Sequence, residues 1–153
     1  MAKFVFKLQS LLNIKTQMED SLKNELGKAI QRVEHEKSVL NQIEHEREDW
    51  IGKIGMQSSK GITVEKLRDY SAYISLLKGK SEKQKENVNT AALNADKIRE
   101  ELVTMVQERK MLEKLKGKKY QDYLNEQLKE DQKLNDDLIS YKYNDRLAGD
   151  ENG

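Results

Sequence analysis

The sequence predicts an all-α fold: a long antiparallel two-helix coiled coil, or helical hairpin, whose second helix is longer than the first. The 153 residues are 36% charged and 36% apolar, with two Phe and one Trp, so little apolar surface is left for a thick core. There is no proline, so no residue forces a helix to break. Apolar residues recur in alternating steps of three and four on both sides of a glycine-rich stretch. This periodicity argues against disorder, which the low mean hydropathy would otherwise fit.

The first predicted helix, residues 4–54, carries a seam of apolar positions with four polar interruptions. The apolar positions are Leu8, Leu12, Leu22, Leu26, Ala29, Val33, Leu40, Ile43, Trp50 and Ile54. The interruptions are Lys15, Glu19, Glu36 and Arg47. Each interruption removes buried apolar area, so we expect a soft coiled coil that bends or opens locally near Glu36.

The second predicted helix, residues 63–143, begins at Thr63, a good N-cap, with Glu65 in its first turn. Its seam consists of Leu67, Tyr70, Ile74, Leu77, Ser81, Gln84, Val88, Ala91, Ala95, Ile98, Leu102, Met105, Arg109 and Leu112. So long a run of alternating steps is hard to obtain by chance. We expect residues 147–153 to form a disordered tail.

The stretch between the two seams, "IGKIGMQSSKGIT" at residues 51–63, could be a linker, a phosphate-binding loop or a turn. It lacks the G-x-x-x-x-G-K-[ST] pattern, and no strand precedes it. The two seams match layer by layer when the chain is folded back on itself. The facing pairs are Trp50 with Leu67, Leu40 with Leu77, Glu36 with Ser81 and Leu26 with Ala91. The sequence therefore predicts a turn at about 55–62 within a single domain, residues 1–153.

In this pairing the first helix ends before the second one does. Leu8 already faces Arg109, so residues beyond about Leu115 have no partner within the chain. They still carry apolar side chains, namely Tyr120, Tyr123, Leu124, Leu128, Leu134, Leu138, Ile139, Tyr141, Tyr143 and Leu147. A single helix in water depends on propensity alone, so this overhang is expected to bind a partner.

Composition excludes several classes of function. The net charge of +1 gives no global field that would attract nucleic acid or an anionic membrane. No cysteine is present, which fits a reducing cytoplasm, and no stretch approaches the 18 apolar residues of a membrane span. "MAKFVFKLQ" at the N-terminus lacks the apolar core of a secretory signal.

The residues that usually carry chemistry are sparse. "EHE" occurs twice, around His35 and His45, but each histidine lacks a set of ligands on one helical face. No Ser/His/Asp arrangement is present either. We therefore predict no enzyme, no catalytic residue, no cofactor and no metal site.

Two surface features leave the interpretation open. The run "RKMLEKLKGKK", residues 109–119, is either a solvated helix face or a contact for phosphates, lipid headgroups or an acidic protein surface. It lacks interleaved aromatic residues, so we do not expect nucleic acid. Tyr73 and Leu76, just beside the seam near Trp50, either flank the core or form part of an apolar partner site.

Three stretches together resemble the FliJ family of flagellar export proteins. They are "MAKFVFKLQSLLNIK" at the start, "KGITVEKLRDYSAYISLL" after the turn and "QERKMLEKLKGKKYQDYL" further on. Their order, spacing and the chain length make the resemblance fairly specific over residues 3–140, although the tail lacks the usual basic ending. The resemblance implies a non-enzymatic stalk or adaptor that promotes the export of flagellar proteins, and thereby motility and chemotaxis. It also implies that the protein is cytoplasmic and lies at the inner face of the cell membrane as a peripheral protein.

The resemblance also implies partners. The end with both termini would contact the hexameric FliI-type export ATPase, and the turn end would contact the cytoplasmic domain of the FlhA-type export gate; export chaperones would bind as well. The ATPase-contact residues implied are Phe4, Phe6, Leu8, Arg109, Lys110 and Lys116. The gate-contact residues implied are Trp50, Tyr73 and Leu77.

Two hypotheses follow from the sequence. The first is the export stalk, which we expect to be a monomer when free and not to insert into the membrane. The second is a general coiled-coil tether or scaffold that dimerises through the C-terminal overhang. Sedimentation discriminates between them, because a monomer at micromolar concentration disfavours the tether.

Overall fold

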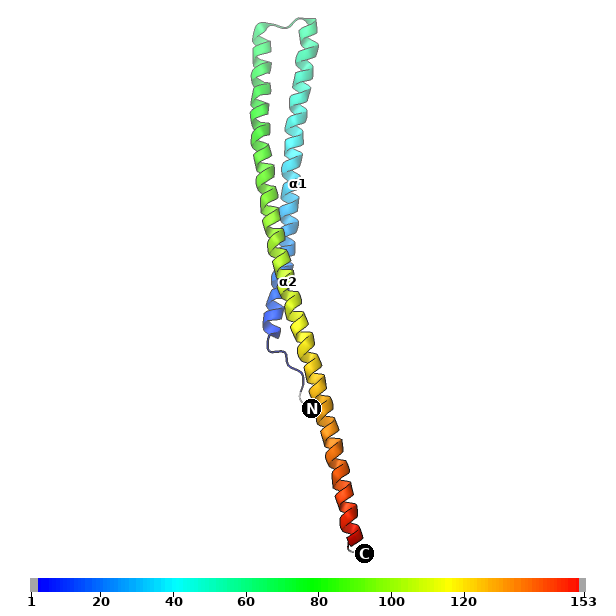
Figure 1. Cartoon of the computed structure of the whole chain (residues 1–153). Helices are drawn as coiled ribbons and strands as arrows, with labels where there is room; N and C mark the ends of the chain where they lie inside the picture. The colour runs from blue at the N-terminus through cyan, green and yellow to red at the C-terminus, as the bar shows by residue number, and fades with distance from the viewer. Residues whose placement is uncertain (1–2, 152–153) are drawn as a thin grey trace. The chain divides into compact units, whose positions relative to one another are not determined.

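The computed structural model describes residues 3–151 and contains two helices, α1 (Gln9–Lys60) and α2 (Val64–Glu151) (Figure 1). α1 has 52 residues and α2 has 88, and no strand occurs within the described residues. The helices pack against each other as a helical hairpin. The predicted fold class, including the longer second helix, is confirmed.

The contacts within the chain define two units, and each is described separately. One is Gln17–Val106, which contains the turn. In this unit α1 and α2 lie side by side and are joined at one end, as Figure 1 shows. The other combines Met1–Thr16 with Gln107–Gly153 and thus holds the start of α1 and the C-terminal part of α2. The single domain predicted from the sequence stays a prediction.

The helix boundaries differ from the predicted ones at three places. α1 begins at Gln9 rather than residue 4, because residues 3–6 are not helical and the Gln9 amide donates to the Phe6 carbonyl at 3.1 Å. α1 also continues through residues 55–60, which were predicted as turn, so Gly52 and Gly55 are helical. Glycine lowers helix stability by only about 1 kcal/mol, too little to end a long helix that is otherwise rich in helix formers.

The third difference lies at the C-terminus, where a disordered tail was predicted for residues 147–153. α2 continues to Glu151, so residues 147–151 are helical, and residues 152–153 lie outside the described part of the chain. No proline interrupts α2, and Leu147 and Ala148 are strong helix formers.

The chain reverses over three residues, Gly61 to Thr63. Gly61 has a φ of 89°, the left-handed conformation that commonly follows the last residue of a helix and favours glycine. Thr63 then caps α2 as predicted: its hydroxyl accepts from the Lys66 amide at 3.4 Å, and its carbonyl accepts from the Leu67 amide at 3.1 Å. Only Gly61 among the three glycines of this stretch is thus required by the turn.

We expect the glycines of this stretch to respond oppositely to alanine. Gly61→Ala places a side chain at positive φ and should lower the free energy of unfolding by about 1 kcal/mol. Gly52→Ala and Gly55→Ala should each raise it by about 0.5 to 1 kcal/mol, because a Cβ there meets no atom within 4 Å. Urea unfolding followed by circular dichroism measures all three, and equal effects at Gly61 and Gly55 would contradict this account of the turn.

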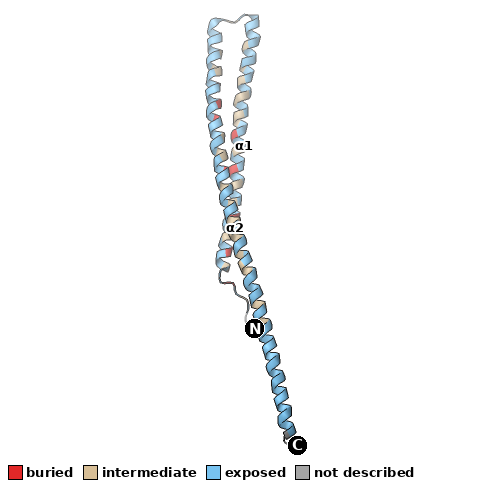
Figure 2. Cartoon of the chain, in the orientation of Figure 1, coloured by how far each residue is buried: buried red, intermediate tan, exposed pale blue. Residues whose placement is uncertain are grey.

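Most of the predicted seam positions are buried or half-buried where α1 and α2 pack together (Figure 2). Two of them, Leu8 and Leu67, are instead exposed; Leu8 precedes α1. The buried side chains include polar ones, Glu19, Glu36, Ser81 and Gln84, beside apolar ones such as Leu12, Ala29, Leu77 and Ala95. The seam is therefore thin and partly polar, as its interruptions predict.

The contacts between α1 and α2 extend beyond the predicted facing pairs. Trp50, predicted to face Leu67, contacts Tyr70 and Tyr73, with ring centroids 5.2 Å apart in both pairs. Glu36, predicted to face Ser81 with Gln84 one layer along, accepts hydrogen bonds from Gln84. A seam with steps of three and four looks almost the same after a shift of three or four residues, so periodicity does not fix the register.

Candidate interaction surfaces

The N-terminal segment lies on α2 in the unit that holds both termini. The Phe4 ring packs edge-on against Tyr120, with centroids 5.2 Å apart, and lies 5.6 Å from the Tyr123 ring. Phe6 is only 8% exposed. Non-helical residues thus pack on α2 between Leu115 and Glu126, within a stretch that the sequence predicts to be without a partner. Residue periodicity cannot reveal this contact, because the covering segment is not a helix.

Three of the six residues predicted for ATPase contact line one groove. Phe4, Phe6 and Leu8 form one wall, and residues of α2 including Leu115, Lys119 and Tyr123 form the other, around about 530 Å³. Because Phe4 is half-buried and Phe6 is buried, their main role in this structure is packing. Leu8, at 39% exposed, leaves apolar surface for a partner.

The three predicted basic residues belong to the same unit but do not line this groove. Arg109 Nη1 forms an ion pair with Glu113 Oε1 at 2.7 Å, and Lys110 is exposed. Lys116 is half-buried. A further ion pair, Lys15 Nζ to Glu108 Oε2 at 2.7 Å, joins α1 to α2 beside them. The run at 109–119 therefore combines residues that stabilise the helices with ammonium groups that face solvent.

α2 is exposed from residue 128 to residue 150 (Figure 2). Seven large apolar side chains there are exposed: Leu128, Leu134, Leu138, Ile139, Tyr141, Tyr143 and Leu147. With 3.6 residues per turn, Leu134, Leu138 and Tyr141 fall on one face of the helix. We call these seven residues the overhang patch.

Near the turn, Trp50, Tyr70 and Tyr73 form an aromatic cluster. The ammonium of Lys53 lies 4.6 Å from the centre of the Trp50 ring, which favours a cation–π contact. Two of the three residues predicted for gate contact, Trp50 and Tyr73, belong to this cluster and are half-buried. The sequence did not single out Lys53 or the pairing of Tyr70 with Trp50.

The third residue predicted for gate contact, Leu77, is not accessible to a partner. It is 1% exposed and is the most completely buried large side chain described. Its neighbour Leu76 is 53% exposed and is the apolar side chain that a partner would meet here.

The Tyr73 hydroxyl donates a hydrogen bond to the Glu46 carboxylate. This hydrogen bond, with desolvation and the charge of Glu46, raises the pKa of Tyr73 above its usual value of 10.0. The neutral phenol is thereby favoured in the folded state. Its contribution to stability is complete at pH values below 10 and is lost as the pH rises through the raised pKa.

We expect Glu46→Gln to lower the pKa of Tyr73 towards 10.0, because it removes the carboxylate that accepts the phenol hydrogen bond and whose charge opposes ionisation. Phenolate absorbance measures the titration, and a Tyr73→Phe variant identifies its contribution among the six tyrosines of the chain. Glu48→Gln is the control and should leave the titration unchanged. The same shift in both variants would show that general surface charge, rather than the hydrogen bond, sets the pKa.

Within residues 3–151, no three His, Asp or Glu side chains are grouped as metal ligands would be. His45 lies 3.9 Å from Glu48 and is exposed, and His35 is exposed as well. Over the same residues, neither helix has an apolar stretch that could span a bilayer.

Comparison with known protein families shows which family the chain belongs to. The chain matches the family described as flagellar FliJ protein over residues 4–148, nearly its whole length. The chain belongs to the FliJ family. It has no match among curated proteins or among solved structures. The predicted resemblance is thereby confirmed.

FliJ-family membership gives the coarse function. Members are non-catalytic components of flagellar protein export, so this chain takes part in that process. Its helical hairpin fits such a role, because its candidate surfaces are exposed apolar and charged side chains on helices.

Proposed function

We propose that this chain is the stalk of the flagellar export apparatus: it binds the hexameric FliI-type ATPase through the unit with both termini and the FlhA-type gate through the turn end. It would act in the cytoplasm, peripheral at the inner face of the membrane, and also bind export chaperones. Its FliJ-family membership carries this proposal. The overhang patch adds physical support, since seven exposed apolar side chains on one helix segment are stabilised by burial against a partner.

The ATPase contact is tested with the purified cognate ATPase. The full chain should increase ATP turnover, and a chain ending at Gln127 should not. Ending the chain at Gln127 removes the overhang patch but keeps Tyr120 and Tyr123, on which Phe4 packs. A chain ending at Leu115 would also remove those tyrosines, so it tests the contact less cleanly.

A pair of point variants separates the overhang patch from the length of the helix. Leu134→Ser/Leu138→Ser should reduce the stimulation about as much as truncation, because both side chains are exposed on one face. Asn135→Ser/Asn144→Ser is the matched control and should keep full stimulation. Full stimulation by the chain that ends at Gln127 would disprove the role of the patch, and no stimulation by the full chain would disprove the ATPase contact.

The gate contact is tested by calorimetric titration of the chain with the cytoplasmic domain of the gate. Leu76→Asp should weaken binding by about tenfold or more, because it places a charge in the exposed apolar surface beside Tyr73. Lys80→Ala, an exposed substitution on the same helix, is the control. Equal affinity of the Leu76→Asp variant and the unmodified chain would exclude this surface.

The exposed apolar side chains after Gln127 also favour the second candidate, a coiled-coil tether that dimerises through them. Sedimentation equilibrium of the full chain distinguishes the two candidates. A dimer that becomes a monomer on truncation at Gln127 would favour the tether, and a monomer at micromolar concentration would favour the stalk.

A further inference from the structure

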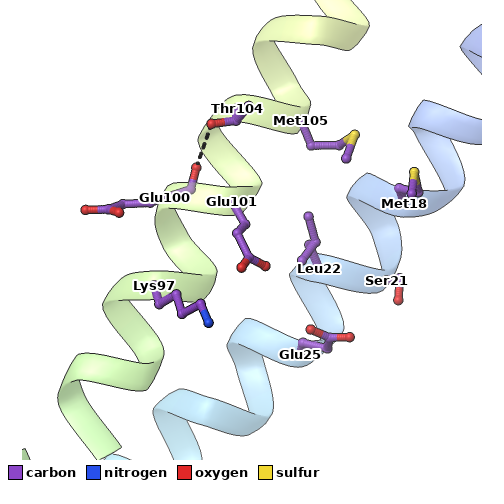
Figure 3. A pocket seen from close by; sticks show the side chains of 9 residues that line it. All are labelled: Met18, Ser21, Leu22, Glu25, Lys97, Glu100, Glu101, Thr104 and Met105. Atoms are coloured by element: carbon purple, nitrogen blue, oxygen red, sulfur yellow. Dashed lines mark hydrogen bonds between the residues drawn. The ribbon is translucent and has the colours of Figure 1, made fainter. Parts of the chain in front are cut away.

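A second groove, distinct from both predicted contact surfaces, lies between α1 and α2 within the unit Gln17–Val106 (Figure 3). It has a volume of about 710 Å³. Met18 and Leu22 of α1 and Met105 of α2 form its apolar part. Met18 is 45% exposed although it adjoins the seam, so the two helices leave apolar surface uncovered here.

Carboxylates dominate the polar rim of this groove. Glu25 comes from α1, Glu100 and Glu101 come from α2, and Lys97 is the single cation that lines it. Figure 3 shows Glu101 between the two helices and Glu100 turned outwards. Within the described part of the chain, none of these three glutamates has an ion pair, whereas Glu19, Glu36 and Glu108 have theirs. The rim is therefore negative and open to an external cation.

These features specify the chemistry of an occupant. A groove between two antiparallel helices accepts a third helix, whose apolar stripe replaces the water over the exposed seam. Methionine side chains adapt to apolar partners of different shape because they are unbranched and polarizable. An excess of unpaired carboxylates at the rim selects flanking Lys or Arg and disfavours acidic helices.

We propose that this groove docks a basic amphipathic helix of a partner protein, with leucine or methionine side chains over Met18, Leu22 and Met105 and with lysine or arginine beside Glu25 and Glu101. The site lies outside the overhang patch and the aromatic cluster near the turn. It requires no opening of the hairpin, because Met18 is 45% exposed and Leu22 and Met105 are only half-buried. It is independent of the proposed ATPase and gate contacts.

The probe for a test is a fluorescein-labelled helical peptide of about three heptads, with Leu at the seam positions and Lys at the flanking ones. A second peptide carries Glu in place of every Lys. Fluorescence anisotropy with the full chain, at near-physiological salt to suppress nonspecific attraction, should show saturable binding of the Lys peptide and much weaker binding of the Glu peptide.

Charge reversal in the groove should weaken binding of the Lys peptide by about tenfold or more in a Glu25→Lys/Glu101→Lys variant. Glu82→Lys/Glu86→Lys is the matched control, because both glutamates are exposed and the change in net charge is the same. Glu25→Gln/Glu101→Gln, which places no like charges together, should fold as the unmodified chain does and should show a smaller loss in the same direction.

Three outcomes would overturn the proposal. One is equal binding by the groove variants and the control variant. Another is equal binding of the Lys and Glu peptides. The third is a dimer of the chain in sedimentation that Met18→Lys converts to a monomer, since a second copy would then be the occupant. Reduced affinity in both groove variants, with full affinity in the control, supports the docking site.

Discussion

Replacing Leu77 by alanine should lower the free energy of unfolding by about 2 to 4 kcal/mol. Leu77 is 1% exposed, which makes it the most completely buried large side chain described. This loss of stability has two parts: the removed methyl groups no longer contribute their free energy of transfer out of water, and the neighbouring side chains pack less well around the cavity. Because the seam is thin and contains four buried polar residues, few other contacts compensate. Urea unfolding followed by circular dichroism measures the change.

Leu76→Ala provides the matched control for this substitution. The two leucines are adjacent on α2, but Leu76 is 53% exposed, so its replacement should change stability by no more than about 0.5 kcal/mol. Trp50 is the one tryptophan of the chain and packs on Tyr70 and Tyr73 in the same unit. Its fluorescence therefore reports unfolding of this unit. Equal losses for Leu76→Ala and Leu77→Ala would contradict the packing described for α2.

Spacing alone predicted the helices and nearly all of their covered faces, because burial in a two-helix coiled coil follows the heptad. Glu36, Ser81 and Gln84 were predicted as seam positions although they are polar, and all three are buried. Spacing does not fix the register in the same way, that is, which residues of α1 face which residues of α2. The contacts of Trp50 with Tyr70 and Tyr73 depend on ring shape, which a pattern of apolar and polar residues does not record.

The candidate surfaces were predicted less completely than the helices. The apolar residues after Gln127 were identified correctly as side chains that α1 leaves uncovered. Leu77 was implied as a gate-contact residue by the family resemblance, but its seam position opposite Leu40 already predicted that it points inwards, and its 1% exposure agrees with the seam. The packing of Phe4 on Tyr120 and Tyr123 joins a non-helical segment to a helix, so it has no signature in periodicity.

The buried polar layer around Glu36 gives the last prediction. Gln84 Nε2 donates to the Glu36 carbonyl at 2.8 Å and also to its carboxylate, and Asn87 donates to Gln84 Oε1 at 3.1 Å. Arg32 Nη2 forms an ion pair with Glu36 at 2.9 Å. Gln84→Leu alone should lower the free energy of unfolding by about 1 to 3 kcal/mol, because the buried Glu36 carboxylate loses a donor.

Replacing both residues should have the opposite effect. Glu36→Leu/Gln84→Leu removes the buried charge together with its donor and should raise the free energy of unfolding by about 1 to 4 kcal/mol, as apolar replacement of buried polar groups often does. Glu34→Leu/Glu86→Leu, at exposed positions, is the control for added apolar side chains and should change little. A double variant less stable than the unmodified chain would show that the polar layer is itself stabilising.

The gain in stability should come with a loss of register, because a polar layer within a seam tolerates only the alignment that pairs its members. The chain contains no cysteine, so Gln42→Cys and Lys78→Cys, both at exposed positions, allow clean attachment of two spin labels. Pulsed dipolar spectroscopy should give one distance with the polar layer intact and more than one in the Glu36→Leu/Gln84→Leu background. A single unchanged distance there would mean that apolar and aromatic packing, Trp50 against Tyr70 and Tyr73 above all, sets the register without Glu36.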